Sequence, residues 1–374
     1  IPGKASYKDL ESLMMKLYAL PYVEKSYYTI NGSTLKIDVE EKELNFIRAG
    51  ANYNSDTGSK LAVGTDFVKL GKIGKVTSLE LEIGEYKSLE FNNFWYYGKK
   101  NKIGIDLKLG YEENPIYIYE GKSLKAESTE ESKFIDLSFT TKLFRQFDLS
   151  TGIKYVDTEN EFDVGSDKYK DLLSENYDYQ EMYLKLILDR KDSSIYPTDG
   201  SYLKAKHEVG GVGSEEVEYY SELGIIQGYI PITPKLSLSG SLSGGIISGG
   251  NIPLEKHFKI GGINNDIDNN YISFYGYNMM GKLASKFMVV QLGAQYMIYS
   301  NLYITAKFNT LTYGSVEDSD LIGNNDDEIY EDYEYGYGLT LGYKSIFGPL
   351  ELSLTNDVNS TESAIISVNM GYVF

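Results

Sequence analysis

The last eleven residues alternate between apolar and small polar side chains, and this pattern constrains the fold more than any other feature of the chain. One face carries Ala364, Ile366, Val368, Met370, Tyr372 and Phe374, and the other carries Ser367, Asn369 and Gly371. A period of two residues marks a β-strand. An apolar face with aromatic residues at its rim, ending on a C-terminal phenylalanine, is typical of the strand that closes an outer-membrane β-barrel.

The same alternation recurs through most of the chain. Leu350, Leu352 and Leu354 alternate with Glu351, Ser353 and Thr355, and Ile105, Leu107 and Leu109 alternate with Asp106, Lys108 and Gly110. A soluble β-sandwich would also alternate, but its inner face would pack a dry core. Here the charged face requires water, and the segments have the ~9 to 11 residues with which a tilted strand crosses a bilayer. The sequence therefore predicts lipid on one face of the sheet and water on the other.

Sixteen strands are predicted, an even number as expected for a single-chain bacterial barrel. They lie at about 45–53, 61–69, 76–83, 88–97, 102–112, 133–144, 147–158, 180–190, 201–209, 216–230, 235–248, 285–299, 301–313, 335–345, 349–357 and 364–374. Short connections, such as 145–146, 231–234 and 346–348, are expected on the periplasmic side. Long loops are expected outside, at 113–132, 159–179, 249–284 and 314–334. The first strand has the weakest pattern and must close against the last one.

Composition agrees with this class and excludes others. The chain has 35 Tyr and 15 Phe, and aromatic residues gather at predicted strand ends, as in the interfacial girdles of barrels. A net charge of −18 argues against nucleic acid as a partner, because phosphate binding needs clustered Lys and Arg. No apolar run approaches the ~20 residues of a membrane helix, and the chain begins at Ile1 without a signal peptide, as expected of a mature or trimmed product.

The first 43 residues have a different pattern. Helical spacing relates Leu10, Leu13, Met14, Leu17 and Tyr18, and Pro21 ends the predicted helix. Two short strands, 25–30 and 34–40, follow and are joined by Asn31-Gly32, a strong hairpin signal. A unit of this size is too small to be stable alone. We therefore predict part of a larger α+β module at 1–43 and an all-β, sixteen-stranded antiparallel transmembrane barrel at 44–374.

Two motifs carry a resemblance to a known family. The run Asp189-Arg190-Lys191-Asp192, continued by Pro197, Gly200 and Tyr202, resembles the D-x-R-D, P-x-x-G signature of the BamA/TamA outer-membrane superfamily. The N-terminal helix and hairpin resemble the end of a POTRA domain. This resemblance implies a barrel-wall signature at Asp189, Arg190, Asp192, Pro197 and Gly200, and a periplasmic POTRA remnant.

A second match lies in the predicted loop 249–284. The run from Ile252 to Phe258 and the pair Gly261-Gly262 resemble the segment that precedes the inward-folded sixth loop of this superfamily. Where the family has V-R-G-F/Y, this chain has Phe274-Tyr275-Gly276-Tyr277, so tyrosine replaces the arginine. The resemblance implies that the loop folds into the lumen and that its tip is anchored against acidic groups, which a phenol can also contact. The alternative is an ordinary surface loop.

A glycine near the end of the last strand has a functional interpretation by the same resemblance. Gly371 can kink, and the family glycine at this place lets the last strand curl away from the first. Such a seam would be a lateral gate, with Gly371, Tyr372 and Phe374 as gate and terminal signal. A client strand or passenger hairpin could then pair with the exposed edge. The alternative is a glycine that only relieves crowding in the lumen.

The arrangement of one partial POTRA before a barrel is similar to a type Vd autotransporter, in which a patatin-like phospholipase passenger comes first. This implies an outer-membrane anchor and translocator of a Gram-negative bacterium, with the lipid hydrolase and its Ser-Asp dyad upstream of Ile1. The implied partners are outer-membrane lipids and lipopolysaccharide, the passenger in cis, periplasmic chaperones and the barrel-assembly machinery. The alternatives are a general insertase of the BamA/TamA type and a passive porin.

The chain itself offers no catalytic residues and no cofactor site. A nucleophile elbow G-x-S-x-G is absent, because Gly240-Ser241-Leu242-Ser243-Gly244 has leucine at the serine position. Of the two histidines, His207 lies on the apolar track of its strand and His257 lies at the foot of the long loop. Both are interpreted as interfacial or loop residues. An integral hydrolase on the barrel rim stays open as an alternative.

The loop 314–334 is rich in carboxylates and lacks Lys and Arg. Such a density could bind a divalent cation, with Asp326 and Asp327 as the candidates. The carboxylates lack the spacing of an EF-hand. The favoured interpretation is therefore a solvated, self-repelling loop without a metal.

Overall fold

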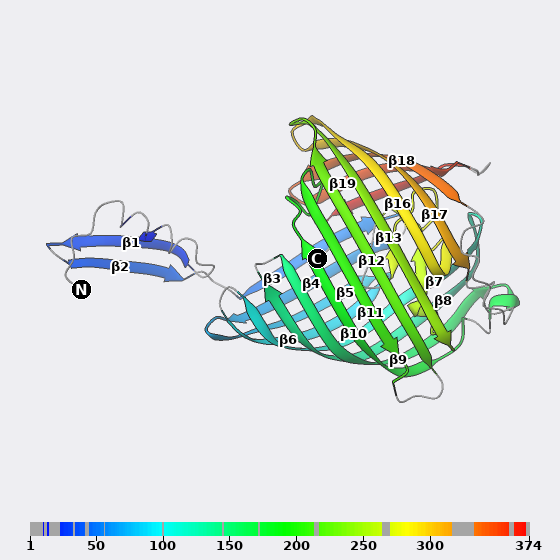
Figure 1. Ribbon diagram of the computed structural model, residues 1–374, viewed down its shortest axis with the longest axis horizontal. Helices are drawn as coiled ribbons and strands as arrows, with labels where there is room; N and C mark the ends of the chain where they lie inside the picture. Colours follow the sequence, from blue (N-terminus) through cyan, green and yellow to red (C-terminus); the bar gives the residue numbers. More distant parts are fainter. Residues whose placement is uncertain are drawn as a thin grey trace.

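The structure is a computed structural model of the 374-residue chain. It describes residues 10, 13–14, 23–32, 34–41, 45–55, 57–98, 101–143, 146–170, 173–212, 217–263, 270–315, 333–358 and 363–371. Near the N-terminus, β1 (Val23–Asn31) and β2 (Thr34–Glu41) form an antiparallel hairpin outside the barrel (Figure 1). Of the predicted helix 10–18, the described residues 10, 13 and 14 are helical and the others lie outside the described part.

Within the described residues, sixteen antiparallel strands close into one barrel, as the sequence predicts. They are β3 (Phe46–Asn54), β4 (Gly58–Lys69), β5 (Ile73–Gly84), β6 (Lys87–Tyr97), β7 (Lys102–Glu120), β8 (Ser123–Leu143), β9 (Phe147–Gly165), β10 (Tyr177–Asp189), β11 (Gly200–Gly210), β12 (Glu218–Pro231), β13 (Leu236–Gly250), β16 (Lys282–Tyr299), β17 (Leu302–Ser315), β18 (Glu334–Ser345), β19 (Gly348–Asp357) and β20 (Ile365–Gly371). Strand β20 pairs with β3 and completes the ring.

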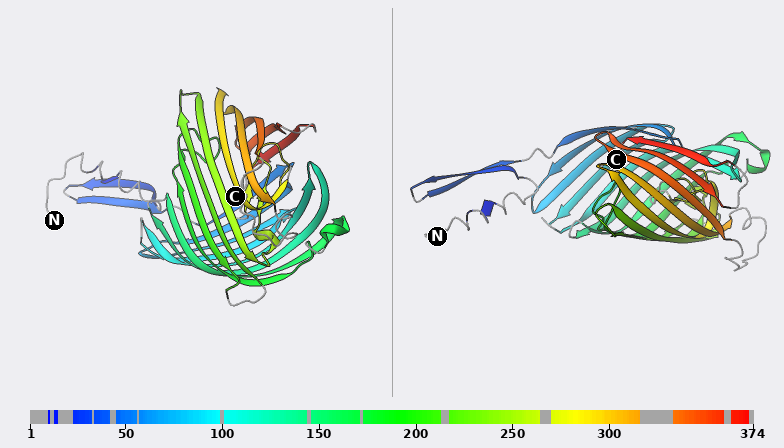
Figure 2. Two further views of the ribbon diagram at one scale, coloured as in Figure 1. Left: turned by 45° about the vertical axis from the view of Figure 1, so that its right-hand side comes forward. Right: turned by 90° about the horizontal axis from the view of Figure 1, so that it is seen from above.

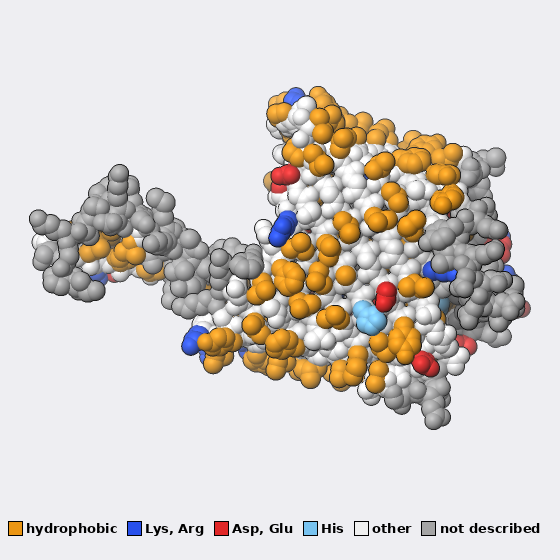
Figure 3. Space-filling view, in the orientation of Figure 1, with side chains coloured by type: hydrophobic (Ala, Val, Ile, Leu, Met, Phe, Trp, Pro, Cys, Tyr) orange, Lys and Arg blue, Asp and Glu red, His pale blue; other side chains and the backbone are white. Residues whose placement is uncertain are grey.

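The two faces of the barrel wall differ as the alternation requires. Along β18 the aromatic and leucine side chains at odd positions are exposed, while Gly336, Gly338, Thr340 and Gly342 are buried on the inner face. Figure 3 shows apolar side chains over much of the outer surface. Among the described residues, no helix has the length and apolar character needed to cross a membrane.

Two of the predicted loops are wrong in part. Residues 113–132 belong mainly to β7 and β8, which form one long hairpin with its turn at 121–122. Residues 159–165 continue β9, and a short 3-10 helix, η1 (Asp167–Tyr169), follows. Both extensions pack a second apolar cluster, made of Ile116, Ile118, Ala126, Tyr169, Leu173 and Leu254. Their charged outward positions hid the strand pattern, because beyond a bilayer the outer face of a strand no longer has to be apolar.

The main apolar core lies between the wall and a chain segment that packs against its inner face. Inward residues of β8 to β13, β16 and β17 supply one part of this core, including Tyr219, Leu223 and Phe287. Phe258, Ile260, Ile272 and Phe274 supply the other part, and each is at most 1% exposed. The side of the lumen that faces β8 to β13, β16 and β17 is therefore packed with side chains.

Candidate functional site

The segment between β13 and β16, residues 252–281, lies within the ring of strands (Figure 2). We call it the lumenal segment; its residues 264–269 lie outside the described part. It contains a short helix η2 (Leu254–Lys256), β14 (Phe258–Ile260) and β15 (Tyr271–Ile272). Strand β14 pairs antiparallel with β16 and parallel with β15, so the segment extends the sheet inward from the wall.

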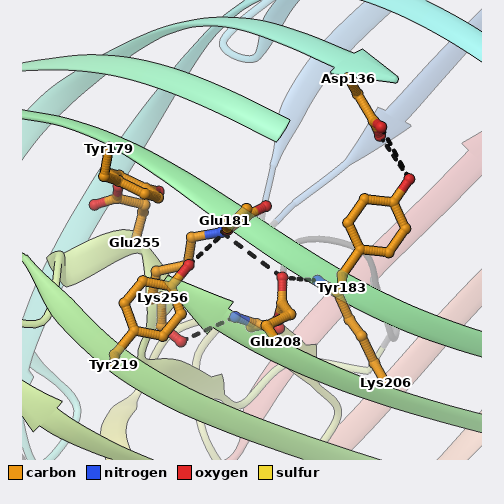
Figure 4. Close-up of polar contacts among 10 residues, drawn as sticks. Asp136, Tyr179, Glu181, Tyr183, Lys206, Glu208, Tyr219, Glu255 and Lys256 are labelled. Carbon is orange, nitrogen blue, oxygen red and sulfur yellow. Dashed lines mark hydrogen bonds and ion pairs between the residues drawn. The ribbon is translucent and has the colours of Figure 1, made fainter. Parts of the chain in front are cut away.

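A buried lysine fastens the start of the lumenal segment to the wall. The Lys256 ammonium forms an ion pair with Glu181 on β10 and lies 3.8 Å from a Glu208 carboxylate oxygen on β11. Figure 4 shows these side chains converging inside the barrel. The Tyr219 hydroxyl donates to Glu181 at 2.5 Å, and Lys206 lies 2.7 Å from Glu208. Both carboxylates are nearly inaccessible, so their charges need compensation: Lys256 supplies it for Glu181, and Lys206 and Lys256 share it for Glu208.

The charge state of Lys256 follows from this arrangement. Burial alone lowers the pKa of Lys256, but Glu181, Tyr219 and Glu208 outweigh it and hold the pKa of the amine well above its usual value. Lys256 therefore stays protonated at neutral pH. Its neighbour Glu255 accepts a hydrogen bond of 3.0 Å from the Tyr179 hydroxyl on β10, which adds a second attachment at the same place.

The tip of the lumenal segment is held by amide side chains of the wall. The Tyr275 backbone N–H donates to Asn309 Oδ1 at 2.8 Å, and Asn309 Nδ2 donates back to the Tyr275 carbonyl at 3.3 Å. Two residues before Tyr275, the Ser273 carbonyl accepts a hydrogen bond of 2.9 Å from Gln291 Nε2. Asn309 lies on β17 and Gln291 on β16, so the tip is fastened to a different part of the wall from Lys256.

Two glycines on the inner face of β18 make room for the tip. A Cβ at Gly336 would lie 1.6 Å from the Tyr275 carbonyl oxygen, and a Cβ at Gly338 would lie 2.2 Å from the Tyr275 ring. Gly276 itself has φ of +118°, and a Cβ there would lie 2.9 Å from the β19 backbone at Asn356 and Asp357. Only glycine fits these three positions without a shift of the backbone.

We expect Gly336→Ala to displace the tip, because the new methyl group would overlap the Tyr275 carbonyl and crowd Asn309. Overpacking of this kind costs about 1–3 kcal/mol. Thermal unfolding and the rate of protease cleavage between Gly261 and Tyr277 measure the effect. Gly224→Ala is the matched control, because a Cβ there meets no atom within 4 Å. Equal behaviour of the two variants would contradict this role for Gly336.

The other motif residues of the lumenal segment shape its turn. Gly261 and Gly262 have φ of +139° and +72°, and Gly262 donates to the Tyr277 carbonyl at 3.0 Å. The rings of Phe274 and Tyr277 stack with centroids 4.9 Å apart. The residue that replaces the family arginine, Tyr275, faces a lysine: the Lys307 ammonium lies 5.0 Å from its ring centroid. The wall residue that contacts Tyr275 is thus the cation Lys307, whereas the resemblance implies acidic groups at this place.

The barrel-wall signature forms the turn between β10 and β11. Gly200 has φ of +107°, and a Cβ there would lie 2.1 Å from the Arg190 carbonyl oxygen. Asp192 accepts hydrogen bonds from the Thr198 N–H at 2.9 Å and from the Thr198 hydroxyl at 2.7 Å. Asp189 accepts from the Lys191 N–H at 3.1 Å. These contacts fix the shape of the turn at the strand ends.

The same turn reaches β16 to β18 through Tyr196, which was not predicted from the sequence. Its ring stacks on Tyr303 of β17 with centroids 4.6 Å apart, and a Cβ at Gly342 would lie 2.2 Å from its hydroxyl. Gln295 on β16 donates to the carbonyls of Tyr196 and Pro197 at 3.4 Å. Tyr196 has φ of +51°, which is costly for a bulky residue and must be offset by these contacts.

We expect Asp192→Asn to lower the unfolding temperature at neutral pH and to have little effect in acid. Partial burial raises the pKa of Asp192, but hydrogen bonds from Thr198 and Asp199 outweigh it and lower the pKa below 3.8. A carboxylate with a depressed pKa stabilises the fold above its unfolded pKa, and this contribution is lost as the pH falls through the folded value. The difference is at most about 1 kcal/mol, because Asp192 is exposed and water screens it. An equal difference between the two proteins in calorimetry at neutral pH and at pH below 3 would contradict this expectation.

At the seam, few residue pairs join the described parts of the first and last barrel strands. In the described residues, β20 and β3 share three residue pairs, namely Asn369 with Asn54, Met370 with Tyr53 and Gly371 with Asn52. By comparison, nine pairs join β3 to β4 and six pairs join β19 to β20. Asn52 adds side-chain hydrogen bonds to Asn369 Oδ1 at 3.2 Å and to the Met370 carbonyl at 2.9 Å.

Gly371 lies directly on this seam. It has φ of +101°, and a Cβ there would lie 2.0 Å from the Ala51 carbonyl oxygen on β3. On its other side, β3 is tied to its neighbours by Arg48, which lies 3.2 Å from Asp66 on β4 and 3.5 Å from Glu80 on β5. Among the described residues, the first strand therefore has more contacts with β4 than with β20.

Four predicted site residues, Tyr372, Phe374, Asp326 and Asp327, lie outside the described part of the chain. Within the described ranges, no group of three or more His, Asp or Glu could hold a metal ion. His207 faces outward on β11 beside Glu222, and His257 is buried in the lumenal segment with 6% exposure. The structure thus places His207 on the outer face of the wall and His257 in the lumenal segment inside it.

The functional residues that sequence reasoning missed are Lys256, Glu181, Glu208, Asn309 and Tyr196. The sequence could have indicated the two glutamates, because they occupy inward-facing positions of strands whose outward-facing positions are apolar. No local pattern pairs them with Lys256, which is 75 residues away from Glu181 in sequence.

Comparison with known proteins gives one family and several similar structures. The model of the OMP85 superfamily matches residues 33–374. No curated protein matches the chain in sequence. BamA from Haemophilus ducreyi lacking POTRA domains 1–3 is similar with a TM-score of 0.70 and 13% identity, over 98% of this chain and 79% of that chain.

Two further structures are similar. CdiB from Escherichia coli has a TM-score of 0.58 and 11% identity, over 98% of this chain and 71% of its own. CdiB from Acinetobacter baumannii has a TM-score of 0.51 and 13% identity, over 99% and 70%. At such identities these structures show a shared fold and nothing beyond it.

Proposed function

The chain belongs to the OMP85 superfamily, and on this premise we propose that it is the outer-membrane translocator of a polypeptide passenger. The family and its barrel fold imply the outer membrane of a Gram-negative bacterium, and a role as translocator or insertase. In the finer form of the proposal, the passenger is N-terminal and in cis, as in a type Vd autotransporter, and is a patatin-like phospholipase.

The observation that carries this proposal is the seam between β3 and β20. Three residue pairs in the described strands and a positive-φ glycine make it the weakest junction among neighbouring barrel strands described here. Each lost backbone hydrogen bond costs only about 0.5–1.5 kcal/mol, so parting a short seam needs little free energy. Parted edges expose unpaired N–H and C=O groups, onto which an extended polypeptide can add as a strand.

The lumenal segment, which packs against one side of the lumen, supports a gated path rather than a permanently open pore. Lys256 and Asn309 fasten the lumenal segment to two parts of the wall, and the core between them is tightly packed. A passive porin needs a water-filled channel, which this packing opposes. Passage therefore follows the seam, or the lumen after release of the segment.

The remaining parts of the proposal rest on resemblance. The hairpin of β1 and β2 is proposed to be the end of a periplasmic POTRA domain that receives the passenger. Outer-membrane lipids and lipopolysaccharide, periplasmic chaperones and the barrel-assembly machinery are its proposed partners. All hydrolytic chemistry is assigned to the passenger, upstream of Ile1.

The test is the size and activity of the native polypeptide. An antibody raised against residues 314–334 is used to blot native outer membranes, and the band is sequenced and assayed for phospholipase activity. A band far above 42.1 kDa with patatin peptides and activity supports the autotransporter proposal. An inactive band enlarged only by further POTRA modules would overturn it in favour of the second candidate, a general insertase, which the same seam would serve.

A further inference from the structure

Three lysines lie together on the hairpin formed by β4 and β5. Lys69 and Lys75 are direct cross-strand partners, and Lys72 lies in the turn between them. From Phe67 to Leu79 the chain contains these three lysines and neither Asp nor Glu, although its net charge is −18. We call Lys69, Lys72 and Lys75 the lysine cluster. It lies at the end of the barrel where the chain enters from β2, because the start of β3 pairs with the end of β4 (Figure 1).

The lysine cluster faces the outside of the barrel at the level of an aromatic girdle. Trp95 and Tyr97 on the neighbouring strand β6 point outward and are 42% and 54% exposed. The Lys75 ammonium nitrogen lies 5.4 Å from the Trp95 ring centroid, and the Lys72 ammonium nitrogen lies 5.3 Å from the Tyr97 ring centroid. Tryptophan and tyrosine at strand ends mark the boundary between headgroups and acyl chains. The ammonium groups therefore lie at headgroup level.

Within the described part of the chain, no carboxylate forms an ion pair with the lysine cluster. Like charges directly opposite each other on adjacent strands are destabilising, so the cross-strand pair in this cluster needs an anion. At the other end of the barrel, outward-facing lysines have such partners: Lys87 pairs with Glu113 at 2.5 Å, and Lys133 pairs with Glu159 at 3.7 Å. The described protein thus supplies anions to the outer surface at one end and leaves the lysine cluster to an anion from outside.

We propose that the lysine cluster binds the phosphate groups of anionic phospholipids in the leaflet that surrounds this end of the barrel. A contact with an aromatic ring leaves N–H donors of the ammonium available, since an ammonium has three of them. Lysines beside a membrane surface attract anionic lipids. The long lysine stem lets the ammonium reach the headgroups while its carbon atoms stay on apolar surface. A lipid phosphate between Lys69 and Lys75 supplies the anion that this pair needs.

Apolar side chains on both sides of the Lys69–Lys75 pair favour lipid over an acidic polypeptide. Phe67 precedes Lys69 on the same face of β4, and Ile73 precedes Lys75 on the same face of β5. Their side chains are 56% and 75% exposed. A phospholipid covers such side chains with its acyl chains and offers its phosphate to the lysines at the same time. An acidic polypeptide would satisfy the charges and leave the apolar side chains exposed.

The choice of leaflet follows from the proposed orientation of the barrel. The hairpin of β1 and β2 leads into this end, and its proposed place is the periplasm, so the lipids are phospholipids of the periplasmic leaflet and not lipid A. This choice rests on the proposed function. The lysine cluster itself involves neither the seam nor the passenger. It therefore goes beyond the proposed function, and its test does not depend on the blot of native membranes.

The fluorescence of Trp95 tests the proposal, because Trp95 is the only tryptophan of the chain and reports on the lipid beside the lysine cluster. The 374-residue chain is reconstituted into phosphatidylcholine vesicles in which part of the lipid carries bromine atoms near the headgroup end of its acyl chains. Bromine quenches a tryptophan that it contacts. We expect brominated phosphatidylglycerol to quench Trp95 at about fivefold lower mole fraction than brominated phosphatidylcholine does, the effect of about one lysine charge at a membrane surface. High salt should reduce this difference.

Charge-removing variants give the decisive comparison. Lys69→Gln, Lys72→Gln and Lys75→Gln in one protein remove the charges and keep most of the side-chain length, so the two brominated lipids should quench Trp95 equally. Lys69→Arg, Lys72→Arg and Lys75→Arg in one protein should retain the preference for phosphatidylglycerol. Lys133→Gln is the matched control, because it removes an outward charge at the other end of the barrel and should behave like the parent chain. A heat-dependent shift in gel mobility confirms that each variant has a folded barrel.

The opposite results overturn the proposal. They are equal quenching of the parent chain by the two brominated lipids, or an unchanged preference for phosphatidylglycerol in the triple glutamine variant. Stronger quenching by brominated lipid A than by brominated phosphatidylglycerol would assign the lysine cluster to the other leaflet and overturn the choice made here. If polyglutamate shifts the Trp95 emission of the parent chain but not of the triple glutamine variant, and phosphatidylglycerol shows no preference, the partner is an acidic polypeptide and the proposal is wrong.

Discussion

Lys256→Met is expected to release the lumenal segment from the wall. The substitution leaves Glu181, a nearly inaccessible carboxylate, without the ammonium that pairs with it, while Glu208 keeps Lys206 at 2.7 Å. Breaking a buried ion pair by removing one partner costs about 3–5 kcal/mol. We expect protease cleavage between Gly261 and Tyr277 to accelerate strongly, and open-channel events to appear in planar bilayers.

A matched lysine separates this effect from a general loss of charge. Lys133 pairs with Glu159 at 3.7 Å, but these side chains are 54% and 61% exposed. Lys133→Met should therefore change stability by less than about 1 kcal/mol. Adding Glu181→Gln to Lys256→Met should restore part of the protection, because it removes one lone buried charge. If Lys256→Met and Lys133→Met resist protease equally, Lys256 does not anchor the segment.

A disulfide across the seam is expected to stop passenger export. Asn54 and Asn369 are direct partners on β3 and β20, and both side chains are buried in the lumen. The neighbouring hydrogen bond from the Ser55 N–H to the Val368 carbonyl places Asn54 and Asn369 at a non-hydrogen-bonded pair, whose Cα atoms are about 4.5 Å apart. That separation suits a disulfide, and the chain has no other cysteine. With Asn54→Cys and Asn369→Cys oxidised, export should fall to background and return after reduction.

The control is a disulfide in the opposite wall. Thr140 and Ser150 are partners on β8 and β9, with hydroxyl oxygens 3.0 Å apart. Thr140→Cys with Ser150→Cys should crosslink without affecting export, because those strands do not part. Normal export by the protein with a locked β3–β20 seam would refute the gate and leave the lumen as the route.

The sixteen strands were predictable because the pattern that encodes them is local. Alternating side chains, such as Leu350 to Thr355, identify a strand and its lipid-facing side without knowledge of its neighbours. The same reasoning failed at 113–132, where β7 and β8 leave the bilayer and Glu113 interrupts the apolar track of β7. Contact with lipid requires apolar side chains on the outer face of a strand, so the alternating pattern ends where the strand leaves the bilayer.

The contacts inside the barrel were not predictable in this way. They join residues that are distant in sequence, such as Lys256 with Glu181 and Tyr196 with Tyr303. The motif glycines gave a partial signal, since Gly261, Gly276 and Gly200 all occupy conformations that glycine favours. What each glycine approaches depends on how the strands are staggered around the barrel, and no local pattern contains that information.

The lumenal segment and the β10–β11 turn have a common mechanical consequence. Lys256 joins the segment to β10 and β11, Asn309 joins it to β17, and Tyr196 crosses independently to Tyr303. Two independent connections, the lumenal segment and Tyr196, thus link separate strands of the wall between β10 and β18, and they make this part of the wall resist bending. Neither of these connections includes β3 or β20, and their described junction has only three residue pairs, so a distorting force would strain it more than the neighbouring junctions. We therefore expect the wall from β10 to β18 to be rigid and the junction of β3 and β20 to be the most easily deformed. The described contacts across the lumen set the position of this deformable junction, because they include neither β3 nor β20.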